Sequence, residues 1–240
     1  MNRSSFVETF RTLIYAVLIA LVVRTFFFEP FNIPSGSMKP TLLVGDYLFT
    51  SKYAYGYSRH SLPFSLPLIP GRVWSALPER GDVAVFKLPA DNRTDYIKRI
   101  VGLPGDRVQM QGGILYINDE AVAKVPIEPF LDEAFGGREI PRYRETLPDG
   151  RSWEVLDMIP SSPFDNTRVF EVPAGHLFAM GDNRDNSQDS RSAFVGFVPI
   201  ENLVGRAEII FFSTDGSARL WEIWKWPFAI RYERLFMRIE

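Results

Sequence analysis

Residues 96–106 read Tyr96-Ile97-Lys98-Arg99-Ile100-Val101-Gly102-Leu103-Pro104-Gly105-Asp106, a mostly apolar run that ends in a turn. β-Branched and aromatic residues bounded by Gly and Pro predict a strand. Alternation with a period of two would place Tyr96, Lys98 and Ile100 on one face of that strand. Other strands are predicted at 83–86, 114–117, 169–180 and 207–212, and a hairpin turn at Asn118-Asp119. The chain is therefore expected to be mainly β.

Length and composition narrow the classes of protein. The 240 residues allow one large domain, or one domain with an insertion, and the polar, weakly periodic residues 125–168 are expected to form a smaller β insertion. A charged fraction of 23% and an apolar fraction of 46% exclude general disorder. The net charge of −2 argues against nucleic acid as the main partner. With no Cys and two His, neither a metal centre nor a cofactor is expected.

An apolar segment at residues 12–28 predicts a membrane anchor. It would span roughly 26 Å as a helix, close to a bilayer core of about 30 Å. A cleaved signal peptide is the alternative, but bulky residues from Phe26 to Phe31 follow, where cleavage needs small ones. Arg3 and Arg11 precede the segment, so residues 1–11 are expected in the cytoplasm and the rest of the chain outside it.

Two polar features that follow the anchor suggest nucleophilic chemistry. In Pro34-Ser35-Gly36-Ser37-Met38-Lys39-Pro40-Thr41-Leu42, two hydroxyls flank a glycine and prolines stiffen the backbone. Such a segment could mount a nucleophile beside an oxyanion donor, or it could be an ordinary turn leaving the membrane. Lys98 lies between apolar neighbours on its strand face, where burial would lower its pKa. A solvated lysine on an edge strand is the alternative.

A third polar feature is the loop Gly181-Asp182-Asn183-Arg184-Asp185-Asn186-Ser187-Gln188-Asp189-Ser190-Arg191. Calcium loops of the EF-hand type need oxygen ligands at the third and twelfth positions, and these positions hold Arg184 and Ala193 here. The loop is instead expected to be compact, with its Asp and Arg residues paired to one another and a hydroxyl presented to the site.

Five motifs together carry a resemblance to a known family. They are the segments 34–42, Gly45-Asp46-Tyr47, Arg80-Gly81-Asp82-Val83, 96–106 and 181–191. Their order and spacing behind an anchor resemble the bacterial type I signal peptidases, from the anchor to about Pro199. The resemblance implies a distorted antiparallel β catalytic core formed by residues 29–109 and 176–220, with a β insertion at 110–175. Many members carry a second transmembrane helix, whereas a single transmembrane segment is predicted in this sequence.

The resemblance also implies roles for individual residues. Ser37 would be the nucleophile and Lys98 its neutral general base. Ser35 would donate to the oxyanion beside the Ser37 N–H, and Ser187 would aim the Lys98 amine. Asp189 and Arg191 would support the site, with Asp182 and Arg184 as further candidates. Shallow substrate pockets would be lined by Phe31, Ile33, Pro34, Tyr96, Ile97 and Val85. His60 and His176 are expected to be structural.

The function expected from these features is removal of signal peptides from exported pre-proteins, after an Ala-X-Ala sequence. The enzyme would be monomeric, need no cofactor, and cross the bacterial inner membrane once with its catalytic domain on the periplasmic side. Two alternatives stay open. One is a relative specialised for a single substrate, and the other is a membrane-tethered β domain that binds partners without catalysis.

Two apolar segments could touch either the core or the membrane. The Pro-broken segment 62–70 is expected to pack over the core, with membrane contact as the alternative. At the C-terminus, residues 221–240 contain Trp221, Trp224 and Trp226, and Tyr232, Leu235, Phe236 and Ile239 follow at helical spacing. The expected helix would either cap the core or lie in the membrane surface.

Overall fold

A single long helix precedes the β core. The structure, a computed structural model, describes residues 3–132, 136–219 and 221–240. Helix α1 (Arg3–Phe26) exposes apolar side chains on all sides, which suits a lipid environment. Within the described ranges it is the one helix long and apolar enough to cross a membrane, over Val7–Phe26. The span predicted at 12–28 overlaps this helix, which ends at Phe26 before strand β1 begins at Phe28.

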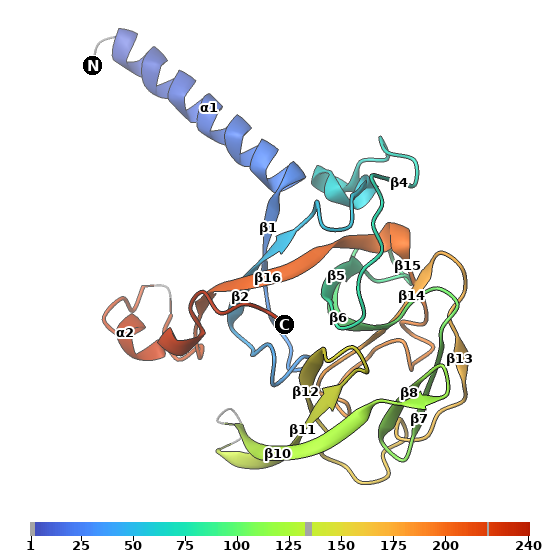
Figure 1. Cartoon of the computed structure of the whole chain (residues 1–240). Helices are drawn as coiled ribbons and strands as arrows, with labels where there is room; N and C mark the ends of the chain where they lie inside the picture. The colour runs from blue at the N-terminus through green and yellow to red at the C-terminus, as the bar shows by residue number, and fades with distance from the viewer. Residues whose placement is uncertain (1–2, 133–135, 220) are drawn as a thin grey trace.

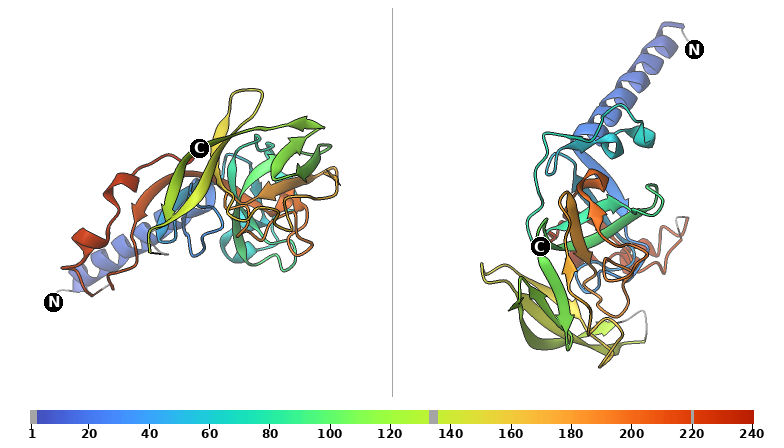
Figure 2. Two further views of the ribbon diagram at one scale, coloured as in Figure 1. Left: turned by 90° about the horizontal axis from the view of Figure 1, so that it is seen from below. Right: turned by 90° about the vertical axis from the view of Figure 1, so that its right-hand side faces the viewer.

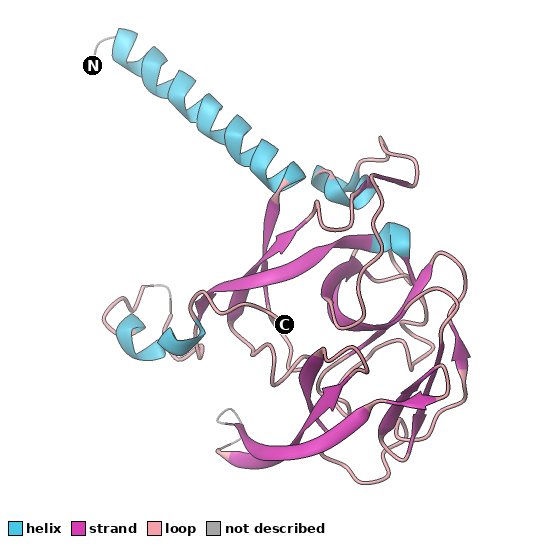
Figure 3. Cartoon of the chain, viewed as in Figure 1, coloured by secondary structure: helices cyan, strands magenta, loops and turns pink. Residues whose placement is uncertain are grey.

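Seven strands form one curled antiparallel sheet, which is the main body of the molecule (Figure 1). Their order in space is β1-β2-β16-β5-β6-β14-β15. The strands are β1 (Phe28–Asn32), β2 (Asp46–Ser51), β5 (Val83–Lys87), β6 (Asp95–Gly102), β14 (His176–Met180), β15 (Val198–Pro199) and β16 (Leu203–Ser213). The mainly β prediction with an antiparallel core and one N-terminal apolar helix is confirmed (Figure 3).

Two smaller sheets lie at the end of the molecule away from α1, and the insertion predicted at 110–175 falls within this part of the chain (Figures 1 and 2). One holds β7 (Arg107–Gln111), β8 (Ile114–Ile117), β9 (Glu120–Ala121) and β13 (Phe170–Glu171); the other holds β10 (Ala123–Asp132), β11 (Arg138–Thr146) and β12 (Ser152–Leu156). Asn118 and Asp119 have φ of 54° and 67°, as the predicted tight hairpin turn requires. The insertion thus begins with β7, three residues before the predicted boundary at 110.

Short elements complete the chain. They are β3 (Tyr57–Ser58) paired with β4 (Arg72–Val73), helix α2 (Trp226–Ala229), and 3₁₀ turns at Arg59–Ser61, Pro63–Ser65, Ile200–Asn202 and Tyr232–Arg234. The segment 62–70, between β3 and β4, is only partly buried, whereas the sequence predicts that it packs over the core. Leu66 and Leu68 are exposed there, and Trp74, just beyond β4, is 84% exposed. The prolines prevent regular pairing, and this loop lies beside the end of α1 (Figure 1).

The C-terminal segment is extended rather than helical beyond Arg234, so the predicted amphipathic helix is wrong. Phe236 has φ of 61°, which ends any right-handed helix. The backbone instead bonds to the edge of β16, with Phe236 N donating to Ile210 O at 2.7 Å and Ile239 N to Glu208 O at 3.0 Å. Arg234 pairs with the buried carboxylate of Asp46. These contacts with the sheet replace the helical hydrogen bonds.

Buried apolar side chains hold the segment that follows β1 against the core. Met38 and Leu42 are fully buried in a cluster with Ile33, Leu48 and Ile210. Each such side chain contributes roughly 1.5–3 kcal/mol when removed from water. The turn that carries Ser37 is therefore fixed against the main sheet by its own apolar residues.

Candidate active site

Ser37 lies against Lys98, which is in the middle of strand β6. Lys98 Nζ lies 2.7 Å from Ser37 Oγ, although the residues are 61 positions apart in the chain. The same amine donates to the Ile97 carbonyl at 2.9 Å. Lys98 is 4% exposed and Ser37 is 9% exposed. The two side chains therefore form a buried hydroxyl–amine pair.

Burial makes this lysine a base that can work near neutral pH. Loss of hydration lowers the pKa of Lys98 to about 8, against the opposing effect of the negative charges of Asp189 and Asp182. A neutral amine beside a hydroxyl can accept its proton. Nucleophilic catalysis by a serine needs a short distance between the hydroxyl and a base, and a base that is neutral near pH 8. The Ser37–Lys98 distance and the lowered pKa of Lys98 meet these two requirements.

The backbone around Ser37 is held from the other side by Asn183. The Asn183 N–H donates to Ser37 O at 3.1 Å, and its side-chain amide donates to Gly36 O at 3.0 Å. Two hydrogen bonds to adjacent carbonyls restrict rotation of the peptide units that carry the nucleophile. The sequence pattern places Asn183 in the polar loop but indicates no role for it.

Gly181 allows the loop 181–191 to approach the nucleophile. A Cβ at Gly181 would lie 2.2 Å from Ser187 Oγ and 2.6 Å from Ser37 O, closer than atoms can pack. The Gly181 N–H also donates to Asp189 Oδ2 at 3.0 Å. A glycine at this position is therefore required by close packing against the site.

Two of the acidic and basic residues in the loop pair outside it, which corrects the expectation of internal pairing. Asp182 accepts two hydrogen bonds from Arg99, each 2.8 Å long, and one from Thr41 Oγ1 at 2.6 Å. Arg184 forms a two-pronged pair with Glu145 on β11, with both N–O distances 2.6 Å. Arg99 and Glu145 received no role from the sequence, because their partners lie far away in the chain.

Asp189 and Arg191 do pair with each other, as predicted. Arg191 donates to both carboxylate oxygens of Asp189, at 2.9 Å and 2.8 Å, and both residues are buried. Burial alone would raise the pKa of Asp189, but Arg191 and the Gly181 N–H outweigh it and lower the pKa. Asp189 is therefore an anion close enough to act on Lys98.

The two other serines are differently placed. Ser35 is exposed, and its Oγ lies 3.4 Å from Ser37 Oγ. Ser187 Oγ is buried and makes no hydrogen bond with any described residue. The expected bond from Lys98 to Ser187 is thus not formed here, since the amine donates to Ser37 and Ile97.

A cavity of about 390 Å³ opens beside the Ser37–Lys98 pair. All the predicted substrate-contacting residues line it. They are Phe31, Ile33, Pro34, Val85, Tyr96 and Ile97, joined by Ser35, Asn186 and Gln188. The structure thus brings the proposed nucleophile, base and apolar pocket residues into one depression.

The histidines lie apart from this pair. His60 Nδ1 contacts Ser65 Oγ at 3.3 Å, and burial together with nearby cations lowers its pKa to about 4. His176 Nδ1 contacts Ala174 O at 3.0 Å.

Three aspartates lie close enough together for their carboxylates to be considered as metal ligands. Asp157, Asp165 and Asp185 have carboxylate oxygens within 4.8 Å of one another. The ammonium of Lys124 already bonds to Asp157 there, which supplies a positive charge from the chain itself.

Comparisons with known proteins place the chain in a family. The family model described as "Signal peptidase, peptidase S26" matches residues 6–212. Signal peptidase I of Rickettsia typhi (strain ATCC VR-144 / Wilmington) is 44% identical over 215 residues, covering 86% of this chain and 80% of that protein. Signal peptidase I of Rickettsia prowazekii (strain Madrid E) gives the same identity and coverage. A crystal structure of a signal peptidase I from Enterococcus faecalis V583 is 26% identical, covers 55% of this chain and 97% of that one, and has a TM-score of 0.33. Because the matching segment includes most of the chain and the relatives match along most of their length, the chain belongs to the signal peptidase family, peptidase S26, and is a peptidase.

Proposed function

We propose that this chain is a membrane-anchored endopeptidase that removes N-terminal signal peptides from exported pre-proteins. The observation that carries the proposal is the 2.7 Å contact between Lys98 Nζ and Ser37 Oγ at the apolar cavity. The printed names of the relatives, Signal peptidase I, supply the substrate class. A binding domain without catalysis would need neither the buried amine nor its contact with the hydroxyl.

The mechanism follows from the positions of the two side chains. Neutral Lys98 takes the proton of Ser37 Oγ as that oxygen attacks the scissile carbonyl carbon. The tetrahedral intermediate collapses when Lys98 returns the proton to the leaving amine. A water molecule, deprotonated by Lys98 in the same way, then attacks the acyl-enzyme and restores Ser37.

The oxyanion of the intermediate would be stabilised by donors next to the nucleophile. The Ser37 N–H belongs to the turn that Asn183 holds, and the exposed Ser35 hydroxyl lies beside it. Because the backbone that carries the Ser37 N–H is held before the substrate arrives, little reorganisation of that donor is needed as charge develops.

Two unpaired strand edges face the substrate cavity. Among the described residues, β1 pairs with β2 alone and β14 pairs with β6 only from Arg99 onward, so residues 95–98 have one free edge there. The residues beside these edges, Phe31 and Ile97, line the cavity. An extended peptide can therefore add its main chain between them by strand addition.

Side-chain selection follows from that extended binding. Alternate residues of the peptide point to the same face, so the residues one and three positions before the cut would enter the apolar cavity together. Its walls come from the sheet and would resist widening. Bulky side chains would be overpacked at a cost of about 1–3 kcal/mol each, so Ala-X-Ala would be preferred.

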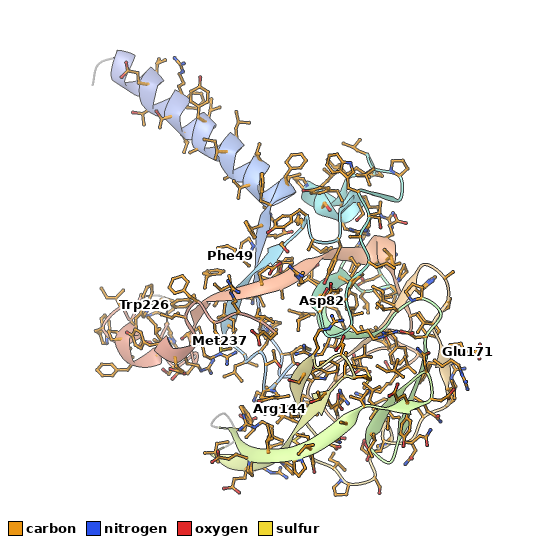
Figure 4. All side chains as sticks on the ribbon, viewed as in Figure 1. Phe49, Asp82, Arg144, Glu171, Trp226 and Met237 are labelled. Atoms are coloured by element: carbon orange, nitrogen blue, oxygen red, sulfur yellow. The ribbon has the colours of Figure 1, made fainter. Side chains whose placement is uncertain are left out.

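Exposed aromatic and apolar residues around α1 and α2 support contact of this side of the domain with the membrane. Trp221, Ile223, Trp224 and Phe228 are exposed near α2, and Trp74, Phe27 and Tyr53 are exposed near the end of α1. Aromatic residues favour the headgroup region of a bilayer. In Figure 1 and the left view of Figure 2, α1 and α2 both lie to the left of the main sheet, and Figure 4 shows Trp226 on that side (Figures 1, 2 and 4). The catalytic domain would rest there on the periplasmic face of the inner membrane, as a single-pass monomer.

Cleavage of a pre-protein by the full chain in proteoliposomes tests the proposal. Ser37→Ala should abolish cleavage because the nucleophile is lost, and Lys98→Ala should abolish it because the base is lost. Lys98→Arg should be equally inactive, because a guanidinium stays protonated near neutral pH and cannot act as the base. An active Lys98→Arg variant would exclude Lys98 as the base, and absence of cleavage by the unaltered chain would favour the binding domain. Cleavage of several unrelated pre-proteins would distinguish a general enzyme from a single-substrate relative.

A further inference from the structure

A second cavity, of about 140 Å³, continues the substrate cavity toward the membrane helix. We call it the polar pocket. Phe31 and Asp95 line both cavities, so the two lie side by side. The polar pocket has four further charged residues in its lining, Arg24, Glu29, Lys52 and Lys87, together with hydroxyl-bearing, apolar and histidine side chains. It holds neither of the catalytic side chains, and the Ser37–Lys98 chemistry makes no use of it.

The order of residues along β1 gives the direction of the combined groove. Glu29 lines the polar pocket, Phe31 lines both cavities, and Ile33 lines the substrate cavity. These three alternate along the chain and form one stripe from the end of α1 toward Ser37. The opposite wall repeats the order, with Lys87 in the polar pocket, Asp95 in both and Ile97 in the substrate cavity.

A signal peptide would enter this groove from the membrane end. Under the proposed function, the part of the substrate before the cut lies in the same bilayer as α1. An extended peptide running beside β1 advances about 3.3 Å per residue, and every second side chain faces the same way. If the residues one and three positions before the cut fill the substrate cavity, the residue five positions before it reaches the polar pocket.

The charges of the polar pocket indicate what that residue should be. Glu29 pairs with both Arg24 and Lys52 at 2.8 Å, and Asp95 pairs with Lys87 at 2.8 Å. Two carboxylates thus face three cations, which leaves an excess of one positive charge. In agreement, burial is the first cause that lowers the pKa of Lys52, and the charges of Arg24 and Lys87 lower it further, against Glu29.

We propose that the polar pocket is a substrate subsite for the residue five positions before the cleavage site, and that it selects a side chain with a carboxylate or carboxamide oxygen. Arg24 and Lys87 are the specificity-determining residues, since they can donate to that oxygen and repel a cation. The inference rests on the proposed function and adds a position to its substrate preference.

Peptides with Ala one and three positions before the cut, and Glu, Gln, Leu or Lys five positions before it, test the inference. The full chain in detergent micelles should cleave the Glu and Gln peptides with a kcat/KM at least about tenfold above that for Lys, since tenfold corresponds to 1.4 kcal/mol. Arg24→Glu and Lys87→Glu should each invert the Glu-to-Lys ratio. Because each variant is scored by a ratio between peptides, a general loss of activity does not imitate the effect.

Arg107→Glu is the matched control, because it also removes an exposed arginine paired with a carboxylate. The Arg107 side chain is 47% exposed and 2.6 Å from Asp119, while that of Arg24 is 63% exposed and 2.8 Å from Glu29. Arg107→Glu should keep the ratio of the unaltered chain. Equal cleavage of the four peptides, or the same ratio in Arg24→Glu as in Arg107→Glu, would overturn the subsite. Failure to cleave any peptide would instead refute the proposed function, and the subsite with it.

Discussion

Lys98 is an amine whose burial carries a free-energy cost and lowers its pKa. Its hydration is lost, and only the more distant carboxylates Asp189 and Asp182 favour its charged form. Arg99, the next residue along β6, instead faces the carboxylate of Asp182 directly and forms a buried ion pair with it. Adjacent basic residues on one strand thus differ in role because their nearest partners differ, a hydroxyl for one and a carboxylate for the other.

The pH dependence of cleavage should report Lys98. With a pKa lowered to about 8, the amine is protonated and inactive below that pH, so kcat/KM should rise through an apparent pKa near 8 and level off above it. A pH profile of peptide cleavage measures this limb. His60→Gln and His176→Gln should leave it in place, and loss of the limb in either variant would point to a histidine base.

Removing the buried amine should stabilise the protein at neutral pH. The folded-state pKa of about 8 lies below the unfolded value of 10.5, so the unfolded chain binds more protons between these values. The folded state of the native enzyme is therefore penalised fully below pH 8, by roughly 3 kcal/mol, and recovers as pH rises toward 10.5. Lys98→Met should raise the free energy of unfolding by about 1–3 kcal/mol at pH 7. Urea unfolding in detergent at pH 7 and pH 10 checks this, and a destabilised variant at pH 7 contradicts it.

At the scale of elements, a buried ion pair connects strand β10 to the turn that carries Ser37. Lys39, two residues after Ser37, places its Nζ 2.6 Å from Asp132 Oδ2 at the end of β10. Both residues are buried, and the Lys39 side chain packs beside Gly36. The hairpin of β10 and β11 therefore contributes to holding the turn that carries Ser37.

Breaking this pair should affect both stability and catalysis. Lys39→Met leaves Asp132 buried without its cation and should cost about 3–5 kcal/mol, while the double variant Lys39→Met/Asp132→Leu should recover most of the loss. Urea unfolding measures the stability, and peptide cleavage should show a lower kcat with little change in KM for Lys39→Met. Removing the exposed Arg107–Asp119 pair, as control, should cost less than about 1 kcal/mol. A similar small cost for Lys39→Met would show that the pair does not hold the turn.

At the scale of the whole molecule, the exposed aromatic residues near α2 should matter only at a membrane. Trp224 and Phe228 are 66% and 87% exposed, so Trp224→Ser/Phe228→Ser should barely change stability. The double variant should cleave a membrane-inserted pre-protein more slowly in proteoliposomes, because apolar contact with the interface is lost. Its cleavage of a soluble peptide in micelles should be unchanged. Equal loss with both substrates would mean that these residues act on the fold.

The sequence by itself determined the features that depend on local pattern. The anchor, the strand at 96–101, the turn at Asn118-Asp119 and the Pro-bounded segment around Ser37 each follow from residues close together in the chain. Local backbone conformation can be predicted from such patterns: alternation with a period of two, a run of apolar residues, or a Gly between two Ser. These patterns do not depend on tertiary contacts. The family resemblance then linked Ser37 to Lys98, which local pattern could not do.

Only the tertiary structure decided which distant groups meet. Asp182 pairs with Arg99 rather than within its own loop, and Arg184 pairs with Glu145 from the insertion. The residues after Tyr232 have helical spacing, but their backbone forms hydrogen bonds with β16 instead of a helix. In the apolar segment 62–70, Leu66 and Leu68 are exposed to solvent. The physical reason is the same in each case. Periodicity shows that a side chain is apolar or charged, but burial, ion pairing and backbone bonding depend on which remote segment is folded against it.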